Sequence, residues 1–476
     1  MGQYVLSVDI GTSSVRARLY DAQGKPQKGM ASQIPYSMTT TPAGGAFIDA
    51  QAMLEMAEKV IDDVLGKIDP CAMSIEAVAM CTFWHNILGV DAAGQPATPL
   101  LSWNDTRPEA VLGELQNSIT PEEFAQRTGC PMHGSYVPAK ILWMHRAEPA
   151  MAKQVRYWMS LGEYLFFRFF GERICSVSMA SASGLLHSAT CQWDEKILNA
   201  IPATPEQFST LQTQPAGLQG LRAEFATRWP ALAGIPWFPA LGDGACSNVG
   251  CGCSSLERIT LMVGTSGAMR MAWEGDFHAP PPGLWCYRID AKRPIQGGAL
   301  SNGGNVFQWM TRSLQLPSLA DLEADLAAMK PDGHGLTVLP FFAGQRSPNW
   351  NANSTATIHG LRLSTGPADI LRASLEAIAY RFAMIHKLLE PLLIKDHVIV
   401  ASGGGLLHSK TWVRIMADVI GRKVCISQVE EASCRGAALY ALEQTGAMET
   451  IAEADPHLGA FFEPDLDAHR IYKKAL

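Results

Sequence analysis

The sequence predicts a two-domain α/β protein, and three observations support this prediction. The chain has 476 residues, more than the roughly 250–300 at which a single hydrophobic core stops growing. Runs of β-prone residues alternate along it with amphipathic helical runs, as in a layered α/β fold. Two similar strand–turn–strand segments, over residues 4–20 and 259–272, stand one in each half and indicate a duplicated domain. We therefore expect one domain over residues 1–245 and a second over residues 246–476.

The first half opens with a predicted β-hairpin that carries polar residues at its bend. Residues 4–8 form a short β-prone run, and the Gly-Thr-Ser-Ser turn at 11–14 interrupts it. Residues 15–20 then alternate apolar and polar side chains. An amphipathic helix is predicted over residues 50–65 and a strand over 75–81, so strands and helices alternate here.

The second half repeats this opening over residues 259–272, with a Gly-Thr-Ser-Gly bend. A long amphipathic helix is predicted to begin at residues 365–367, because proline suits a first helical turn. Its apolar face consists of Ile370, Leu371, Leu375, Ile378, Phe382, Ile385 and Leu389. A buried strand over 398–401 then leads through a Gly-rich turn at 402–405 into a helix over 410–420.

Composition excludes several classes of function. Charged residues make up 17% of the chain, against roughly 25% in average soluble domains. The net charge is −7 and no basic tract stands out, so we expect no nucleic-acid partner. No apolar run reaches the roughly 18–20 residues of a membrane helix, and Met1–Val8 lacks the features of a signal peptide. We therefore expect a cytoplasmic protein with no membrane partner.

The eleven cysteines are scattered, and an odd number in a chain of this size does not indicate a disulfide framework. Cys246, Cys251 and Cys253 lie close together in the sequence. They have no matching second pair and no histidine partner, so we interpret them as small buried thiols rather than as a zinc site.

Two acids and three polar turns form the candidate chemistry. The turns at 11–14, 264–267 and 402–405 each follow a strand, where exposed backbone N–H groups can bind phosphate oxygens. Asp9 and Asp243 stand at the ends of apolar strands. Such an acid often only caps a turn, but phosphoryl transfer needs one acid to hold hydrated Mg²⁺ and one to accept a hydroxyl proton.

Two spaced sets of residues carry a resemblance to a known family. The fuller set comprises Ala356, Ile358, Gly360, Leu361, Asp369, Ile370, Ala373, Ser374, Leu375 and Glu376. The second is Lys140–Met144. It is preceded by Val137, at a position where the family usually has Pro, Ser or Thr. On these residues the sequence resembles the FGGY family of carbohydrate kinases over nearly its whole length. The resemblance implies two ribonuclease-H-like domains of the actin-like ATPase superfamily, with a cleft between them.

Within this family, several stretches look most like gluconate kinases. They are residues 127–133, 163–164, 178–184, 286–287, 302–304 and 343–351. Xylulose kinases are the close competitor, because they share Trp103-Asn104-Asp105, Arg107 and a histidine that matches His85. Glycerol kinases look less similar, since Phe83-Trp84-His85 stands where they carry an Arg-Glu pair.

The resemblance also implies roles for individual residues and requires ATP and Mg²⁺ as cofactors. Asp243 would be the catalytic base, and Asp9 with Asp243 would hold the metal. The expected nucleotide-binding residues are Gly11, Thr12, Ser13, Gly264, Thr265, Ser266, Gly403, Gly404 and Gly405. The expected substrate-binding residues are Trp84, His85, Asn104, Asp105 and Arg107. Two of these have an alternative interpretation, His85 as a hydrogen-bonded core histidine and Trp84 as core packing.

The functional hypothesis is an ATP-dependent sugar kinase with gluconate as first choice and a pentulose such as xylulose as second. A gluconate site needs positive charge near the carboxylate, for which Arg107, Lys140 and Arg346 are the candidates. A hypothesis of a different class is a non-catalytic actin-like ATPase module. The expected partners are the sugar or sugar acid and ATP, and a homodimer is possible because related kinases are often dimers.

Overall fold

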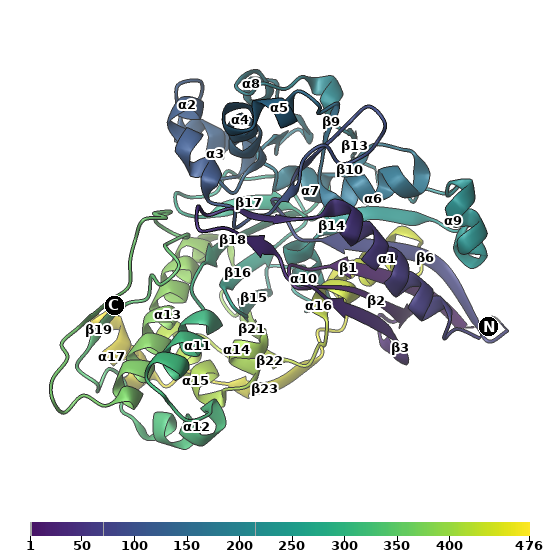
Figure 1. Cartoon of the computed structure of the whole chain (residues 1–476). Coiled ribbons are helices and arrows are strands. Elements are labelled where there is room, and N and C mark those ends of the chain that lie inside the picture. Colours follow the sequence, from purple (N-terminus) through teal and green to yellow (C-terminus); the bar gives the residue numbers. More distant parts are fainter. Residues whose placement is uncertain (1, 70, 215) are drawn as a thin grey trace.

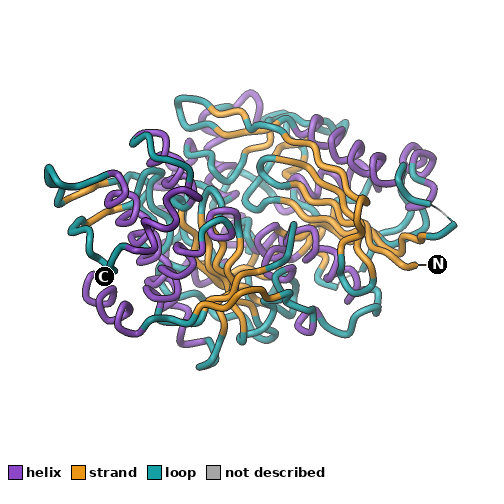
Figure 2. The backbone as a smooth tube through the Cα atoms, turned by 90° about the horizontal axis from the view of Figure 1, so that it is seen from below, coloured by secondary structure: helices purple, strands orange, loops and turns teal. Residues whose placement is uncertain are grey.

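The computed structural model describes residues 2–69, 71–214 and 216–476, and two mixed sheets form its core (Figures 1 and 2). The first sheet contains β1 (Gly2–Ile10), β2 (Ser14–Asp21), β3 (Pro26–Pro35), β6 (Met73–Thr82) and β14 (Trp237–Gly242). The second contains β15 (Arg258–Val263), β16 (Gly267–Ala272), β17 (Trp285–Arg288), β18 (Pro294–Leu300), β21 (Val398–Ser402), β22 (Val424–Ser427) and β23 (Leu458–Phe462). The strand orders are β14-β6-β1-β2-β3 and β17-β18-β16-β15-β21-β22-β23. The predicted two-domain α/β fold is confirmed.

The two predicted hairpins are confirmed, and they occupy equivalent places in the two sheets. In the first, β1 pairs antiparallel with β2, which sets Asp9 opposite Arg16, and pairs parallel with β6. In the second, β15 pairs antiparallel with β16 and parallel with β21. Each half therefore places a polar bend at the same edge of its sheet, which is the arrangement that a duplicated domain predicts.

The three predicted helices are also confirmed, as α1 (Ala50–Leu65), α13 (Pro367–Leu389) and α15 (Lys410–Ile420). The Asp49 side chain caps α1 by accepting from two backbone N–H groups of its first turn. Burial of α13 extends beyond its predicted apolar face, because Arg372 and Glu376 are buried as well. They form an ion pair of 2.6 Å, and α12 (Leu319–Ala328) and β19 (Thr337–Leu339) cover that side of the helix.

The long segment between β6 and β14 forms the upper part of the first half in Figure 1. Its helices are α2 (Leu112–Gln116), α3 (Pro121–Thr128), α4 (Val137–Ala147), α5 (Pro149–Ala152), α6 (Leu161–Phe170), α7 (Val177–Ser181), α8 (Glu195–Asn199) and α9 (Ala223–Arg228). The second half adds α11 (Gly304–Ser313), α14 (Gly404–Leu407) and α17 (Leu466–Ala475). Among the described residues, no helix has the length and apolar character needed to cross a bilayer.

Two helices join the halves between the sheets. The helix α10 (Asp243–Gly250) follows β14 and packs against α16 (Ala432–Gln444), which comes from the far end of the chain (Figure 1). A Cβ atom at Gly250 would lie 1.9 Å from the Ala432 carbonyl oxygen, and one at Gly436 would lie 1.8 Å from that of Cys246. The helix backbones can approach this closely only because both positions are glycine. Since α16 also packs on β1 and β6, this junction sets the position of α10 against both sheets.

Polar contacts of α16 reinforce the junction. Arg435 is 1% exposed and donates hydrogen bonds to the carbonyl oxygens of Gly24, Gly250 and Asp455. At the start of the helix, Glu431 forms an ion pair of 3.2 Å with Arg16. The bend after β2 and the end of α10 are thus attached to the same helix of the second half.

We predict that Gly436→Ala will destabilise the protein and displace α10. The added methyl group cannot fit against the Cys246 backbone, and overpacking of this kind costs about 1–3 kcal/mol of unfolding free energy. Chemical denaturation measures the loss. The matched control is Gly113→Ala in α2, where a Cβ atom meets nothing within 4 Å and alanine should stabilise by up to ~1 kcal/mol. Equal stability of the two variants would contradict the close packing of α10 on α16.

Candidate active site

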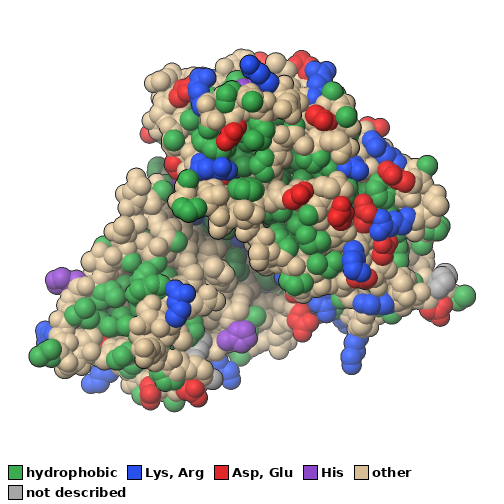
Figure 3. All heavy atoms as spheres, in the orientation of Figure 1, with side chains coloured by type: hydrophobic (Ala, Val, Ile, Leu, Met, Phe, Trp, Pro, Cys, Tyr) green, Lys and Arg blue, Asp and Glu red, His purple; other side chains and the backbone are tan. Residues whose placement is uncertain are grey.

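A cleft of about 750 Å³ lies between the two halves and is lined by residues of both. Figure 3 shows the surface hollowed where the halves meet. The first half contributes Thr12, Met38, Trp103, Asn104, Asp105, Thr106, His133 and Ser135. The second half contributes Met262, Gly264, Thr265, Ser266, Ser301, Asn305, Ala343, Gln345, Arg346 and Ala352. Residues of both hairpin bends predicted from the sequence therefore line the cleft.

Asp9 lies near the end of β1 and is 2% exposed. Its Oδ1 accepts a hydrogen bond of 2.9 Å from the Cys81 thiol, and its Oδ2 accepts one of 3.3 Å from Arg16 Nη1. Burial raises the pKa of Asp9 to about 6, although Cys81 and Arg16 both lower it. Asp9 is thus a buried acid with a single cation beside it, and that cation is shared with Glu431.

Asp243 is the first residue of α10 and directly follows β14. Its Oδ1 accepts from the Gly244 N–H at 2.8 Å and from the Trp84 N–H at 3.3 Å. Burial raises the pKa of Asp243, while the charge of Arg270 lowers it. The charge of Asp243 in turn adds to the burial that raises the pKa of Asp9. The two carboxylates therefore belong to one electrostatic environment.

The two Gly/Thr/Ser bends are held in shape by backbone hydrogen bonds. The Gly11 N–H donates to the Ser14 carbonyl oxygen at 3.0 Å and closes the first bend. In the second half, the Gly264 carbonyl oxygen accepts from the Gly304 N–H at 2.8 Å, so the start of α11 packs against the β15–β16 bend. Thr12, Gly264, Thr265 and Ser266 reach the cleft.

The predicted Gly-rich turn after β21 packs behind the β15–β16 bend. Gly403 has a φ of +84°, and a Cβ atom there would lie 2.5 Å from the Val263 carbonyl oxygen. Only glycine fits this conformation and this approach. Gly404 and Gly405 begin the short helix α14, so the turn is more ordered than a flexible loop. Gly403 and Gly405 therefore pack against the Val263 backbone, directly before that bend.

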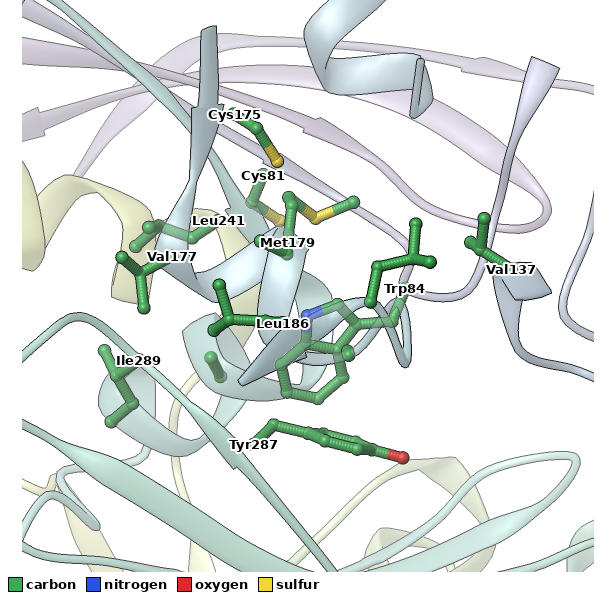
Figure 4. Packing of buried hydrophobic residues seen from close by; sticks show 14 of the residues in the cluster. Cys81, Trp84, Val137, Cys175, Val177, Met179, Leu186, Leu241, Tyr287 and Ile289 are labelled. Atoms are coloured by element: carbon green, nitrogen blue, oxygen red, sulfur yellow. The ribbon is translucent and has the colours of Figure 1, made fainter. Parts of the chain in front are cut away.

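Trp84 and His85 belong to an aromatic cluster with Tyr136 and Tyr287, and they are only 6% and 8% exposed. The Trp84 indole lies over Tyr287 with ring centroids 5.1 Å apart (Figure 4), and the His85 ring is 4.9 Å from Tyr136. His85 Nδ1 donates to the Ala182 carbonyl oxygen at 2.6 Å, and burial lowers the pKa of His85. In this structure both side chains therefore have the surroundings of packed core residues.

Within the Trp103–Arg107 segment, Asp105 and Arg107 pair with each other, and Asn104 is exposed. Asn104 is exposed and lines the cleft. Asp105 is 1% exposed and accepts from Arg107 Nη2 at 2.6 Å and from the Ala46 N–H at 3.2 Å. The Arg107 guanidinium also lies over Trp143, 4.2 Å from the ring centroid. Asp105 and Arg107 therefore pair with each other, whereas the Asn104 side chain is exposed at the cleft.

Of the three cations predicted for a carboxylate, Arg346 lines the cleft. Its guanidinium lies 5.6 Å from the Trp103 ring and 5.5 Å from the Trp350 ring, and its Nε has no hydrogen-bond partner among the described residues. Lys140 is fully buried and donates to the His85 carbonyl oxygen. Arg346 is therefore the candidate with a free donor.

Sequence reasoning missed three polar groups of this region. His133 and Asn305 line the cleft, and His133 Nε2 lies 3.1 Å from Glu109 Oε1. Arg270 is buried on β16 beside Asp243. A signal for Arg270 was present, because it is the only charged residue in an otherwise apolar and small run directly after the Gly-Thr-Ser-Gly bend.

The cysteine cluster fits the interpretation as buried thiols, because Cys246, Cys251 and Cys253 are all free and buried. Among the described residues, one group has the spacing of a metal site, formed by Asp332, His334 and Glu376. It lies at α13, and Glu376 there is already paired with Arg372.

Two sheet domains that face one cleft, each with a polar bend that can bind phosphate oxygens, have the architecture that suits a two-domain phosphotransferase. Residues 4–250 match the N-terminal domain of the FGGY family of carbohydrate kinases, and residues 260–444 match its C-terminal domain. The chain therefore belongs to the FGGY family of carbohydrate kinases, and it is an ATP-dependent enzyme that transfers phosphate to a sugar hydroxyl. This assignment excludes the non-catalytic ATPase module.

Known relatives span the full chain at low identity. A gluconokinase of Bacillus subtilis (strain 168) is 26% identical over 488 aligned residues, which cover 99% of this chain and 94% of the relative. A xylulose kinase of Escherichia coli (strain K12) is 24% identical, covering 88% of this chain and 85% of the relative. The crystal structure of a gluconate kinase from Lactobacillus acidophilus superposes with a TM-score of 0.91 at 24% identity, covering 100% and 96% of the two chains.

We predict that Lys140 makes stability depend on pH. Burial lowers the pKa of Lys140 from 10.5 to about 7, although Asp105 raises it. Between these values the unfolded chain binds more protons than the folded protein, so the free energy of unfolding rises with pH, by up to ~1.4 kcal/mol per pH unit. Denaturation at about pH 7 and about pH 9 should show this rise, and Lys140→Met should reduce it. The exposed Lys59→Met is the control, and identical pH slopes for Lys140→Met and wild type would refute the prediction.

Proposed function

We propose that the enzyme phosphorylates a hydroxyl group of a sugar acid, with gluconate as the favoured substrate. The observation that carries this proposal is the free Arg346 guanidinium in the cleft. It is held between two indole rings, and no carboxylate oxygen of the described residues lies within 4.0 Å of it. An arginine that is positioned but unpaired suits a ligand carboxylate, which it can bind with two parallel hydrogen bonds. The similarity to gluconokinases is consistent with this choice.

Asp243 is the proposed catalytic base. It stands at the N-terminus of α10, where two backbone N–H groups fix one of its carboxylate oxygens. Its other oxygen, Oδ2, is then available to accept the proton of the attacking hydroxyl as the γ-phosphoryl group is transferred. Base catalysis of this kind contributes typically ~10²–10⁴-fold to the rate.

The two bends are the proposed phosphate-binding elements. Thr12 and Ser13 from the first half, and Gly264, Thr265 and Ser266 from the second, offer backbone N–H groups and hydroxyls to the ATP phosphates. The glycines at 403–405 are proposed to lie near the adenosine. Positioning and electrostatic stabilisation of this kind account for most of the catalysis in phosphoryl transfer.

Asp9 and Asp243 are the proposed carboxylates for Mg²⁺. Their donor set suits this ion, because Mg²⁺ keeps several waters and needs only one or two carboxylates. A cation would also stabilise the charged form of Asp9, because burial raises the pKa of Asp9 and Arg16 is shared with Glu431. Bound Mg²⁺ would neutralise charge on the phosphates. The residues' own task is to hold the hydrated ion beside the first bend.

A pentulose such as xylulose is the second candidate substrate. The observation that favours it is Asn104, which is exposed in the cleft and lies in the Trp103–Arg107 run that resembles xylulose kinases. An amide can bind sugar hydroxyls without requiring a charge on the ligand. We also propose a cytoplasmic location, supported by the ATP requirement and by eleven cysteines that are all free.

We predict that Asp243→Ala abolishes turnover and leaves nucleotide binding largely intact. Loss of the base should reduce kcat by at least ~10²-fold, whereas the bends that face the phosphates are unchanged. A coupled assay of ADP release measures kcat, and calorimetry measures ADP affinity. The control is Asp63→Asn at a partly exposed position in α1, where the carboxylate bonds to Ser32 and Lys59, and it should retain full activity. Near-normal phosphorylation by Asp243→Ala would defeat the assignment of the base.

We predict that gluconate gives the highest kcat/KM in a panel with D-xylulose, L-xylulose, D-ribulose and glycerol. The physical reason is the free Arg346, which gains a charge-assisted hydrogen bond only from an acid. ADP release measured with each sugar, and without any sugar, makes the comparison. A clear preference for a neutral pentulose would replace gluconate by the second candidate. A slow rate that no sugar stimulates would contradict both.

A further inference from the structure

Arg270 is a buried arginine without a hydrogen-bonded partner. It lies on β16 and is 9% exposed, and its Nε and Nη1 atoms are buried without a hydrogen-bond partner among the described residues. Two glycines make room for its side chain. A Cβ atom at Gly297 would lie 3.1 Å from Arg270 Cγ, and one at Gly244 would lie 3.2 Å from its Nε. The side chain therefore extends from the second sheet to the start of α10, next to Asp243.

Burial of these donors is costly unless something pairs with them. An unpartnered polar group in a protein interior loses its hydration, and the loss is larger for a charged group. The nearest acid is Asp243, but no carboxylate oxygen of the described residues comes within 4.0 Å of the Arg270 guanidinium. Two other arginines of the region are already paired, Arg16 with Asp9 and Arg107 with Asp105. Arg270 thus has unused donors beside the reaction centre.

A second arginine with an unused donor lies in the same region. Burial lowers the pKa of Arg270, and the positive charge of Arg346 lowers it further. Burial and the charge of Arg346 likewise lower the pKa of His85, whose ring lies against Tyr287 with centroids 5.5 Å apart. Arg270 and Arg346 thus each have a donor nitrogen without a hydrogen-bond partner among the described residues. An anionic ligand group is the natural partner for such donors.

We propose that Arg270 and Arg346 together bind the carboxylate of the acceptor, and that Arg270 determines the preference for a sugar acid over a neutral sugar. This inference rests on the proposed function and adds a second arginine to the proposed carboxylate subsite. Arg346 approaches the ligand from the open cleft, between Trp103 and Trp350. Arg270 approaches it from the buried side, over Gly244.

The position of Arg270 along its strand favours the acceptor over the transferred phosphoryl group. β16 begins at Gly267, directly after the bend that faces the ATP phosphates. Arg270 is three residues further on, which places its backbone roughly 10 Å from that bend. Ala268, two residues earlier, lies on the same face of the strand and has a small side chain. The guanidinium is thus set back from that bend and lies next to Gly244 and Asp243.

The test compares Arg270→Met with wild type on gluconate and on a neutral sugar that the enzyme also phosphorylates, such as D-xylulose. We expect kcat/KM for gluconate to fall ~10–100-fold more than kcat/KM for the neutral sugar, because a charge-assisted hydrogen bond to the ligand is lost. Arg270→Lys should recover part of the difference. Arg346→Met should produce the same selective loss, which keeps the test decisive if Arg270→Met does not fold. The matched control is Arg258→Met on neighbouring β15, where the arginine pairs with Glu257 outside the cleft.

The outcomes separate this inference from the proposed function. An equal loss of kcat/KM on both sugars would indicate that Arg270 acts on the phosphoryl group, and it would overturn the inference. An unchanged kcat/KM on both sugars would also overturn it. If wild type phosphorylates a neutral sugar but not gluconate, the proposed function fails. The subsite is then tested by competition. Inhibition by gluconate that Arg270→Met removes would support the carboxylate subsite, and absence of inhibition would overturn it.

Discussion

The parallel pairing of β1, β6 and β14 determines where the acids of the site lie. Because the three strands run in the same direction, their carboxyl ends meet at one edge of the sheet, with Asp9 opposite Cys81 and Gly242 opposite Thr82. Asp9 ends one strand and Asp243 follows another, on either side of β6. Ligands of α/β proteins bind at such an edge. The separation of the two aspartate backbones is therefore set by the hydrogen bonds of the sheet.

The second half completes the site because α16 locks α10 in place. The helix contacts at Gly250 and Gly436 leave no space for a side chain, so α10 cannot shift without disturbing α16. This matters for Asp243, whose carboxylate orientation depends on the first turn of α10 and on the Trp84 N–H. Trp84 is in turn fixed by Tyr287 from β17 of the second half (Figure 4). The proposed base is therefore held from both halves, which preorganises it for its task.

Much of the fold and part of the site can be predicted from the sequence, because their signals are local. The cap and periodicity of residues 50–65 and the proline that starts α13 specify helices within one stretch of chain. Asp9 and Asp243 are marked by their place at strand ends. The surroundings of Trp84 and His85 are not local, since residues about 200 positions later in the chain cover them. The same holds for the buried face of α13, where Arg372 and Glu376 pair beneath elements from other parts of the chain.

The charges of the cleft have a polarity that follows from this construction. Two acids stand at the edge of the first sheet, where the charge of Asp243 adds to the raised pKa of Asp9, and two arginines belong to the second half, where the charge of Arg346 adds to the lowered pKa of Arg270. A cation beside the acids and an anion beside the arginines would offset both effects at once. In the proposed mode of binding, hydrated Mg²⁺ with ATP and a carboxylate-bearing acceptor would supply those two charges. Binding energy gained at the arginines, away from the reacting hydroxyl, would then be available to position that hydroxyl against Asp243. The proposed mode of binding thus connects the choice of substrate with the rate of transfer.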